Sequence, residues 1–272
     1  MKDKTITFEE AKKLNTANLK GLAKDFSKQS FWHYTKAQNL PKIFSTEEKG
    51  YTLLCNSLTH MNDLTERSRD NAQNVFVFCF CNTESEKIPM WYLYGSLTGN
   101  GAAIGFTPSK MLEFLNSISY VYGTRTIDNA TTSEKIPINT LDIKYGWIYY
   151  AKYEHDKTKF YYKQKFYEIT DFDKDCNNFY FLEEYAWNYE KEFRIVIIDK
   201  ENRNFNNILL PIPQNLAKQL KLKVGTTFSY QSYKLPMEES KIQRSTLKIE
   251  MDLLERFKDE ILDYNNKQKN NF

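Results

Sequence analysis

The sequence lacks any long apolar run. No stretch approaches the roughly 20 consecutive apolar residues that a membrane-spanning helix needs, and no signal peptide is visible. We therefore expect a cytoplasmic protein with no membrane partner. The four cysteines include no second Cys or His pair with the spacing of a zinc site, so we expect reduced thiols and no bound metal. They are Cys55, Cys79, Cys81 and Cys176.

The sequence also has almost no net charge. Its 272 residues carry 38 Lys and Arg against 35 Asp and Glu, which gives a formal charge of +3. This balance provides no global field for nucleic acid or for an acidic membrane surface. A local basic patch stays compatible with it, because lysines are spread along the whole chain. Aromatic residues are abundant, with 19 Phe and 19 Tyr, and we expect many of them in the core.

Local patterns predict an α+β protein with a central mixed or antiparallel sheet and flanking helices, in a single domain over residues 1–272. Thr7 and Glu10 have the spacing of a capping box, which predicts a helix within the N-terminal segment 1–29. Apolar runs rich in aromatic and β-branched residues predict the strands. These are expected at 30–35, 51–57, 75–81, 102–106, 143–153 and 193–198, with an edge strand at 208–211.

Helical spacing and early prolines predict the helices. An amphipathic helix is expected near the C-terminus, because apolar residues recur at helical spacing from Leu247 to Ile261. The tail 265–272 is Asn- and Lys-rich, and we expect it to be frayed. The polar segment 124–137 is expected to be a mobile loop. The other helices are expected at 40–44, 88–95, 109–115, 157–166 and 215–222.

The first candidate site residue is His33. On a strand His33 and Thr35 share one face, while Trp32 and Tyr34 share the other. A histidine beside a threonine can hold a ribose or a diphosphate by hydrogen bonds. The alternative is a buried histidine that bonds a backbone carbonyl.

Two further clusters have both structural and functional interpretations. Asn62 and Asp63 form a polar turn with Glu66 nearby, which turn formation and helix capping explain without a ligand. Trp91 and Tyr94 share one side of a short helix with Met90, a stripe typical of a core. The glycines that follow this helix allow a ligand to approach the backbone closely.

The fourth cluster is the segment 187–194, in which Glu190, Glu192 and Arg194 are expected to share one face of a strand. Two neighbouring carboxylates repel each other, which raises the proton affinity of one and suits it to acid–base chemistry. The alternatives are a surface charge ladder neutralised by Arg194, or a structural ion pair that locks the strand to the core.

The order of these motifs resembles a widespread bacterial family of unknown function. The resemblance covers roughly residues 30 to 250. One departure is Leu64, which stands where that family often has Pro after Asn-Asp. The motifs that carry the resemblance are Trp32-His33-Tyr34-Thr35, Met61-Asn62-Asp63, Phe78-Cys79-Phe80, Met90-Trp91-Tyr92-Leu93-Tyr94, Ala103-Ile104-Gly105-Phe106 and the segment 187–194.

The same order is similar, more distantly, to that of ADP-ribosyltransferases, which implies their fold and NAD as the substrate. By this resemblance His33 and Thr35 hold the nicotinamide ribose, and Tyr94 stacks on the ring. Glu192 stabilises the oxocarbenium-like centre, and Glu190 orients or deprotonates the acceptor. The expected catalytic residues are therefore His33, Glu190 and Glu192, and the expected cofactor-binding residues are Tyr34, Thr35, Ser57, Asn62, Asp63, Trp91, Tyr94 and Arg194.

Three functions are compatible with these patterns. The first is an NAD-using ADP-ribosyltransferase-like enzyme or NAD glycohydrolase, in a toxin or in phage defence. The second is a non-catalytic module that binds a nucleotide or a partner. The third is a metal-dependent nuclease that uses Asp63, Glu66 and the Glu190–Glu192 pair. The enzymatic interpretations with NAD require His33, Tyr94 and Glu192 to meet in one cleft.

Overall fold

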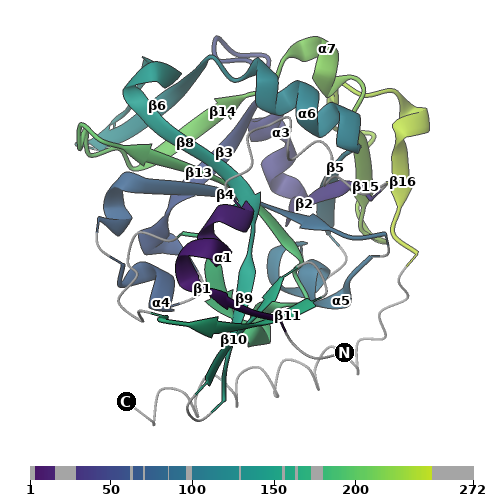
Figure 1. Cartoon of the computed structure of the whole chain (residues 1–272). Helices are drawn as coiled ribbons and strands as arrows, with labels where there is room; N and C mark the ends of the chain where they lie inside the picture. The colour runs from purple at the N-terminus through teal and green to yellow at the C-terminus, as the bar shows by residue number, and fades with distance from the viewer. Residues whose placement is uncertain are drawn as a thin grey trace.

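Two β-sheets carry most of the chain in the computed structural model (Figure 1). The structure describes residues 4–15, 29–61, 64–69, 71–84, 86–95, 100–128, 130–154, 157–162, 165–172 and 180–246. Within these residues one sheet has eleven strands and the other has five, and the helices are short. This agrees with the expected α+β class. No helix in these ranges is long and apolar enough to cross a membrane.

The large sheet is built around β4 (Val75–Asn82), whose continuous apolar sequence is buried on both faces, as expected for a central strand. Its neighbours along one edge are β13 (Glu192–Asp199) and then β8 (Leu141–Trp147). The remaining strands are β2 (Phe31–Lys36), β3 (Thr52–Ser57), β5 (Gly101–Phe106), β6 (Tyr120–Ile127), β7 (Ala130–Pro137), β14 (Asn207–Pro211), β15 (Lys221–Val224) and β16 (Ile242–Arg244).

The other edge of β4 is divided between two strands. β2 pairs with its C-terminal end, through Trp32 opposite Cys81, and β3 pairs with its N-terminal end, through Asn56 opposite Val77. In the described chain the stretch 78–80 of β4 therefore has β13 on one edge and no strand pairing on the other. The sheet is split at this point, and the candidate site lies in the split.

The five-stranded sheet lies below the large one in Figure 1. Its strands are β1 (Lys4–Thr7), β9 (Tyr149–Glu154), β10 (Lys157–Tyr162), β11 (Lys165–Thr170) and β12 (Leu182–Glu184). A hydrophobic cluster joins the two sheets, because Val77 and Val196 of the large sheet pack with Tyr149 and Phe160 of the small one. The small sheet thus covers one face of β4 and β13.

Short helices fill the connections. The larger hydrophobic core lies on the face of the large sheet that carries Phe76, Phe78 and Phe80, and α6 contributes Phe114 to it. The helices and helical turns are α1 (Phe8–Asn15), η1 (Ala37–Asn39), α3 (Leu40–Ile43), η2 (Leu58–His60), α4 (Leu64–Arg67), η3 (Ala72–Asn74), α5 (Ile88–Met90), η4 (Trp91–Gly95), α6 (Pro108–Ser117), η5 (Ile138–Thr140), η6 (Tyr185–Trp187), α7 (Gln214–Ala217) and η7 (Glu239–Lys241).

The N-terminal capping box is confirmed. The backbone amide of Glu10 donates to Thr7 Oγ1 over 3.1 Å, and the amide of Thr7 donates to Glu10 Oε2 over 2.8 Å. Helix α1 begins immediately after Thr7. Residues 4–7, which precede this helix in the N-terminal segment, form β1 in parallel pairing with β11.

The expected loop at 124–137 is wrong. Strands β6 and β7 form a hairpin whose pairing of Ile127 with Ala130 leaves two residues for the turn, and Asp128 there has a φ of 49°. Asp tolerates this left-handed conformation better than most residues. The segment is polar because nearly all of β7 is exposed to solvent, so its composition resembled that of a loop.

Three other expectations differ from the structure. The helix at 157–166 is wrong: this segment carries β10 and the start of β11, which pair with each other. The strand at 143–153 is broken at Ile148, where the chain passes from β8 in one sheet to β9 in the other. Strand β14 pairs with both β3 and β6, so it is not an edge strand. The helix at 215–222 ends at Ala217 and a strand follows, whereas the C-terminal amphipathic helix lies outside the described residues.

Candidate functional site

A cavity of about 570 Å³ opens at the split in the large sheet. Its walls come from β2 and β4, from the turn of η1 and α3, from η4, and from the start of β13. His33, Tyr94, Glu190 and Glu192 all line it, although about 160 residues separate the first from the last. The early strand and the late strand therefore meet across one hollow, as the NAD-using interpretation requires.

His33 occupies the unpaired edge of β4. Its Nδ1 lies 3.1 Å from the carbonyl oxygen of Cys79, and its ring packs on Phe78 with centroids 4.2 Å apart. A carbonyl only accepts, so Nδ1 carries the proton and Nε2 is left as an acceptor. Burial lowers the pKa of His33 to about 4, and the imidazole is therefore neutral at physiological pH. The bond to a backbone carbonyl is confirmed, and His33 also lines the cavity, whereas its contact with a ribose stays a prediction.

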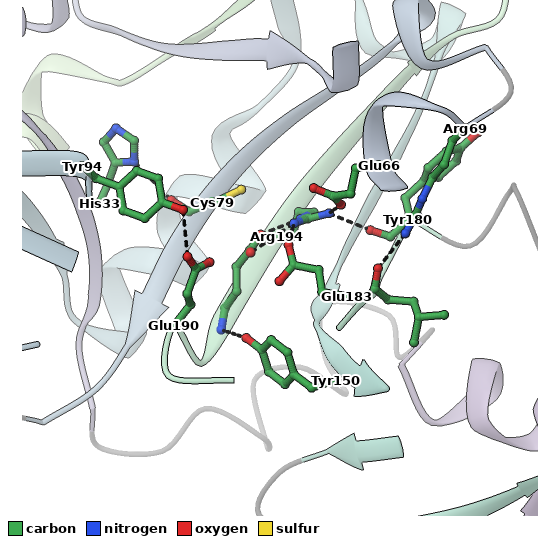
Figure 2. Close-up of polar contacts among 12 residues, drawn as sticks. His33, Glu66, Arg69, Cys79, Tyr94, Tyr150, Tyr180, Glu183, Glu190 and Arg194 are labelled. Carbon is green, nitrogen blue, oxygen red and sulfur yellow. Dashed lines mark hydrogen bonds and ion pairs between the residues drawn. The ribbon is translucent and has the colours of Figure 1, made fainter. Parts of the chain in front are cut away.

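Glu190 faces His33 from the other wall and is held by Tyr94 (Figure 2). The Tyr94 hydroxyl donates to Glu190 Oε1 over 2.7 Å. Burial raises the pKa of Glu190 to about 8, with a further contribution from the negative charge of Glu192. Tyr94 lies on η4, a single π-helical turn of a kind often found at functional sites. Lys191 has a φ of 45°, so the chain turns sharply between Glu190 and Glu192.

Glu192 is engaged differently. Arg194, which is fully buried, donates to both of its oxygens, from Nε over 2.5 Å and from Nη2 over 3.1 Å. Arg194 also bonds Glu183 Oε1 over 2.5 Å, Glu66 Oε1, and the carbonyl of Tyr180 over 3.1 Å. Figure 2 shows this guanidinium between the glutamates. Arg194 thus ties α4 and β12 to β13.

Four buried glutamates lie around Arg194, and the charge of Arg69 also acts on Glu66. Glu66, Glu183, Glu190 and Glu192 are each at most 6% exposed, and burial raises the pKa of Glu66 and of Glu183. Among the described residues, the second oxygen of Glu66 and that of Glu183 are buried without a hydrogen-bond partner. The inner end of the cavity is therefore a strongly electronegative, dry environment that favours a proton or a cation.

Among the described residues, Glu183, Glu190 and Glu192 form the one group that could hold a metal ion, with oxygens within 4.8 Å of one another. Both oxygens of Glu192 and one of Glu183 already accept from Arg194. The guanidinium therefore acts as the counter-ion of this group. Glu183 and Glu190 both line the cavity, and their carboxyl groups suit a cationic ligand group.

The structure separates the expected site residues into two sets. His33, Tyr34, Thr35, Tyr94, Glu190 and Glu192 line the cavity. Ser57, Trp91 and Arg194 do not. Asn62 and Asp63 lie outside the described residues.

Each of the three residues outside the cavity wall has another role. Ser57 caps η2 by accepting from the Thr59 amide, and its hydroxyl donates to the Ala72 carbonyl over 2.9 Å. Trp91 is buried and donates from Nε1 to Glu86 Oε2 over 3.0 Å. Arg194 lies behind Glu192 as its counter-ion. These bonds give the three residues a supporting role in the structure, and their expected contact with a ligand stays a prediction.

Sequence reasoning missed Glu183 and Tyr150. Glu183 lies on β12, a three-residue strand without any periodic pattern, and Tyr150 accepts from the Glu192 amide over 2.8 Å across the two sheets. No local sequence pattern marks either residue, because both reach the site only through the packing of one sheet on the other.

A scan against protein-family models and searches of curated proteins and of solved structures gave no match to this chain. The site is therefore defined by its geometry.

Proposed function

We propose that the cavity binds NAD and that the protein cleaves its nicotinamide–ribose bond, as an ADP-ribosyltransferase-like enzyme or an NAD glycohydrolase. The observation that carries this proposal is the convergence of a neutral histidine, a tyrosine and a buried glutamate of raised pKa around one cavity. Its volume of about 570 Å³ lies within the usual range for small-molecule and cofactor sites.

Glu190 is the candidate catalytic carboxylate. When the bond between ribose C1′ and the pyridinium nitrogen breaks, its electron pair goes to nitrogen and neutral nicotinamide leaves. Positive charge then develops on the ribose, and the ionised form of Glu190, which is the minor form at pH 7, stabilises this charge in a low-dielectric site. The acceptor, water or a nucleophile, bonds C1′ and gives its proton to Glu190. A pKa of about 8 makes Glu190 a better base than an ordinary carboxylate.

His33 is the candidate ribose-binding residue. Its Nε2 is an acceptor for a ribose hydroxyl, because Nδ1 is committed to Cys79. A neutral imidazole does not repel the cationic pyridinium ring, whereas a positively charged imidazolium would repel it. Thr35 lies two residues along the same strand, and Asn39 Nδ2 donates to its Oγ1 over 2.9 Å. That bond fixes the hydroxyl at the cavity wall.

Glu192 is a positioning residue in this proposal. Its two oxygens are occupied by Arg194, and its amide donates to Tyr150. These bonds fix the start of β13 and thereby the turn that presents Glu190. The role of oxocarbenium stabilisation, expected for Glu192 by resemblance, passes to Glu190, whose Oε2 has no such ion pair.

The test is nicotinamide release from NAD at high protein concentration, together with melting in the presence of NAD. Wild type is expected to release nicotinamide and to melt at a higher temperature with NAD. The Glu190→Gln variant should no longer release nicotinamide. The control variant Glu47→Gln, which replaces an exposed glutamate outside the cavity, should release it as wild type does. Stabilisation by NAD without any release would identify a non-catalytic binding module. The absence of both would refute the proposal.

A further inference from the structure

The charges that line the cavity are separated by depth. At its exposed mouth the charged side chains in the described lining are Lys36 and Lys42. At its buried end they are four glutamates, of which three bond Arg194, while the charge of Arg69 also acts on Glu66. A cavity with one basic and one acidic end is a template for a ligand that carries its own charges in the opposite order.

We infer that this arrangement orients the ligand and selects its charge state. The oxidised, cationic pyridinium ring takes the glutamate end, and the pyrophosphate takes Lys36 and Lys42. This inference rests on the proposed function for the identity of the ligand. It adds that the site discriminates NAD⁺ from NADH, and that Lys36 and Lys42 determine the affinity for the ADP-ribose half.

The acidic end favours a cation because its carboxylates are incompletely compensated. Within the described part of the chain, Glu183 Oε2 is buried without a hydrogen-bond partner, and Glu190 accepts a hydrogen bond from Tyr94, which is neutral. A cationic ring close to these oxygens gains Coulomb energy in a poorly screened environment. The dihydronicotinamide ring of NADH is neutral and gains none, although its shape and polar groups are nearly the same.

The basic end is built by the chain that leaves β2. Lys36 is the last residue of β2, and η1 and α3 follow directly and carry Lys42. Asn39 lies between the two lysines and is bonded to Thr35, which fixes this turn against the strand. Two lysine charges match the two negative charges of a pyrophosphate diester, and lysines bind phosphate as flexible point charges.

The spacing along β2 fits this orientation. His33 and Lys36 are three residues apart on the strand, which corresponds to about 10 Å. Alternation places the His33 and Lys36 side chains on opposite faces of β2, but both line the cavity, so a ligand with its ribose at His33 would reach Lys36 where the strand ends. The same strand thus contacts the reacting ribose at one end and the pyrophosphate at the other.

The experiment measures ligand binding to wild type and to two matched variants. Lys36→Ala/Lys42→Ala removes the basic mouth, and Lys218→Ala removes an exposed lysine outside the cavity. ADP-ribose, nicotinamide riboside and NADH are titrated by calorimetry. NAD⁺ is followed by its KM for nicotinamide release, or by calorimetry if no release occurs. Melting temperatures check that each variant is folded.

The mouth variant is expected to bind ADP-ribose and NAD⁺ about tenfold or more weakly, as loss of charge-assisted contacts implies. Its affinity for nicotinamide riboside, which lacks phosphates, should stay unchanged. Wild type should bind NADH at least about tenfold more weakly than NAD⁺. Lys218→Ala should behave as wild type in every titration.

Other results overturn the inference and separate it from the proposed function. Equal affinity for NAD⁺ and NADH, or a mouth variant with wild-type affinity for ADP-ribose, would refute the inference even if nicotinamide is released. The expected binding pattern without release would refute the catalytic proposal and support the inference. Failure of every probe to bind wild type would overturn both.

Discussion

Replacement of Glu190 by glutamine should stabilise the protein while it abolishes activity. Glutamine keeps the shape of the side chain and an oxygen that accepts from Tyr94, but it removes the ionisable group. Because burial and Glu192 raise the pKa of Glu190 to about 8, the folded protein retains a proton that the unfolded chain releases above pH 4.5. Unfolding is therefore favoured by rising pH between about 4.5 and 8, and stability is lost across this window.

The size of the effect follows from the two pKa values. At pH 7 the unfolded chain has passed its pKa of 4.5 by 2.5 units, and each unit corresponds to about 1.4 kcal/mol. Glu190→Gln should thus raise the free energy of unfolding by about 3 kcal/mol at pH 7. For a chain of this length that corresponds to an increase in Tm of roughly 5–10 °C. The gain should vanish near pH 4.5, where both states hold the proton.

Urea unfolding of both proteins from pH 4.5 to pH 8 provides the assay. The difference between them isolates Glu190, since every other titrating group is shared. A variant that is as stable as wild type or less stable at pH 7 would refute the claim that burial keeps Glu190 protonated in the folded protein. A gain of the same size at pH 4.5 and at pH 7 would show that packing, and not the buried charge, is responsible.

Three further predictions follow from contacts of the same cavity. Glu192→Gln should lower the free energy of unfolding by about 3–5 kcal/mol, because it breaks a buried ion pair on one side; a loss below about 1 kcal/mol in urea would contradict its anchoring role. Because the pKa of His33 is about 4, its imidazole should stay neutral down to about pH 5 in NMR titrations. Its contribution of about 3 kcal/mol to the free energy of unfolding should be lost as the pH falls from 6.5 towards 4. His33→Gln should therefore show a shallower loss of stability in that range, and an unchanged slope would argue against a buried neutral histidine. Gly105→Ala should cost about 1–3 kcal/mol, because the added Cβ would lie 2.5 Å from the Trp32 ring; a wild-type Tm would show that this ring moves freely.

Much of the large sheet could be predicted from local sequence. The apolar run of β4 and the aromatic strand β2 have strong patterns, and the capping box located the start of α1 within one residue. The hairpin of β6 and β7 and the strands β10 and β11 could not, because β7 is polar and almost fully exposed, and β10 and β11 mix lysines with aromatic residues without a clear alternation. In such segments pairing with neighbouring strands decides the conformation, and local propensity is overridden.

The candidate site was partly visible in the sequence. His33, Glu190 and Glu192 stand out because polar side chains interrupt strand-like segments, and the structure brings them to one cavity. Their individual roles were not visible. Which of the two neighbouring glutamates is free depends on Arg194 and on the left-handed turn at Lys191. Glu183 reaches the site only because the small sheet packs on the large one.

The most direct measurement is a crystal structure of Glu190→Gln grown with NAD, since this variant should bind the dinucleotide without consuming it. Our account predicts intact NAD in the split of the large sheet. Its nicotinamide ribose should lie within hydrogen-bond distance of His33 Nε2, and its ring should lie beside the side chain at position 190. NAD bound elsewhere, or bound here with the adenine end against the glutamates, would contradict the account.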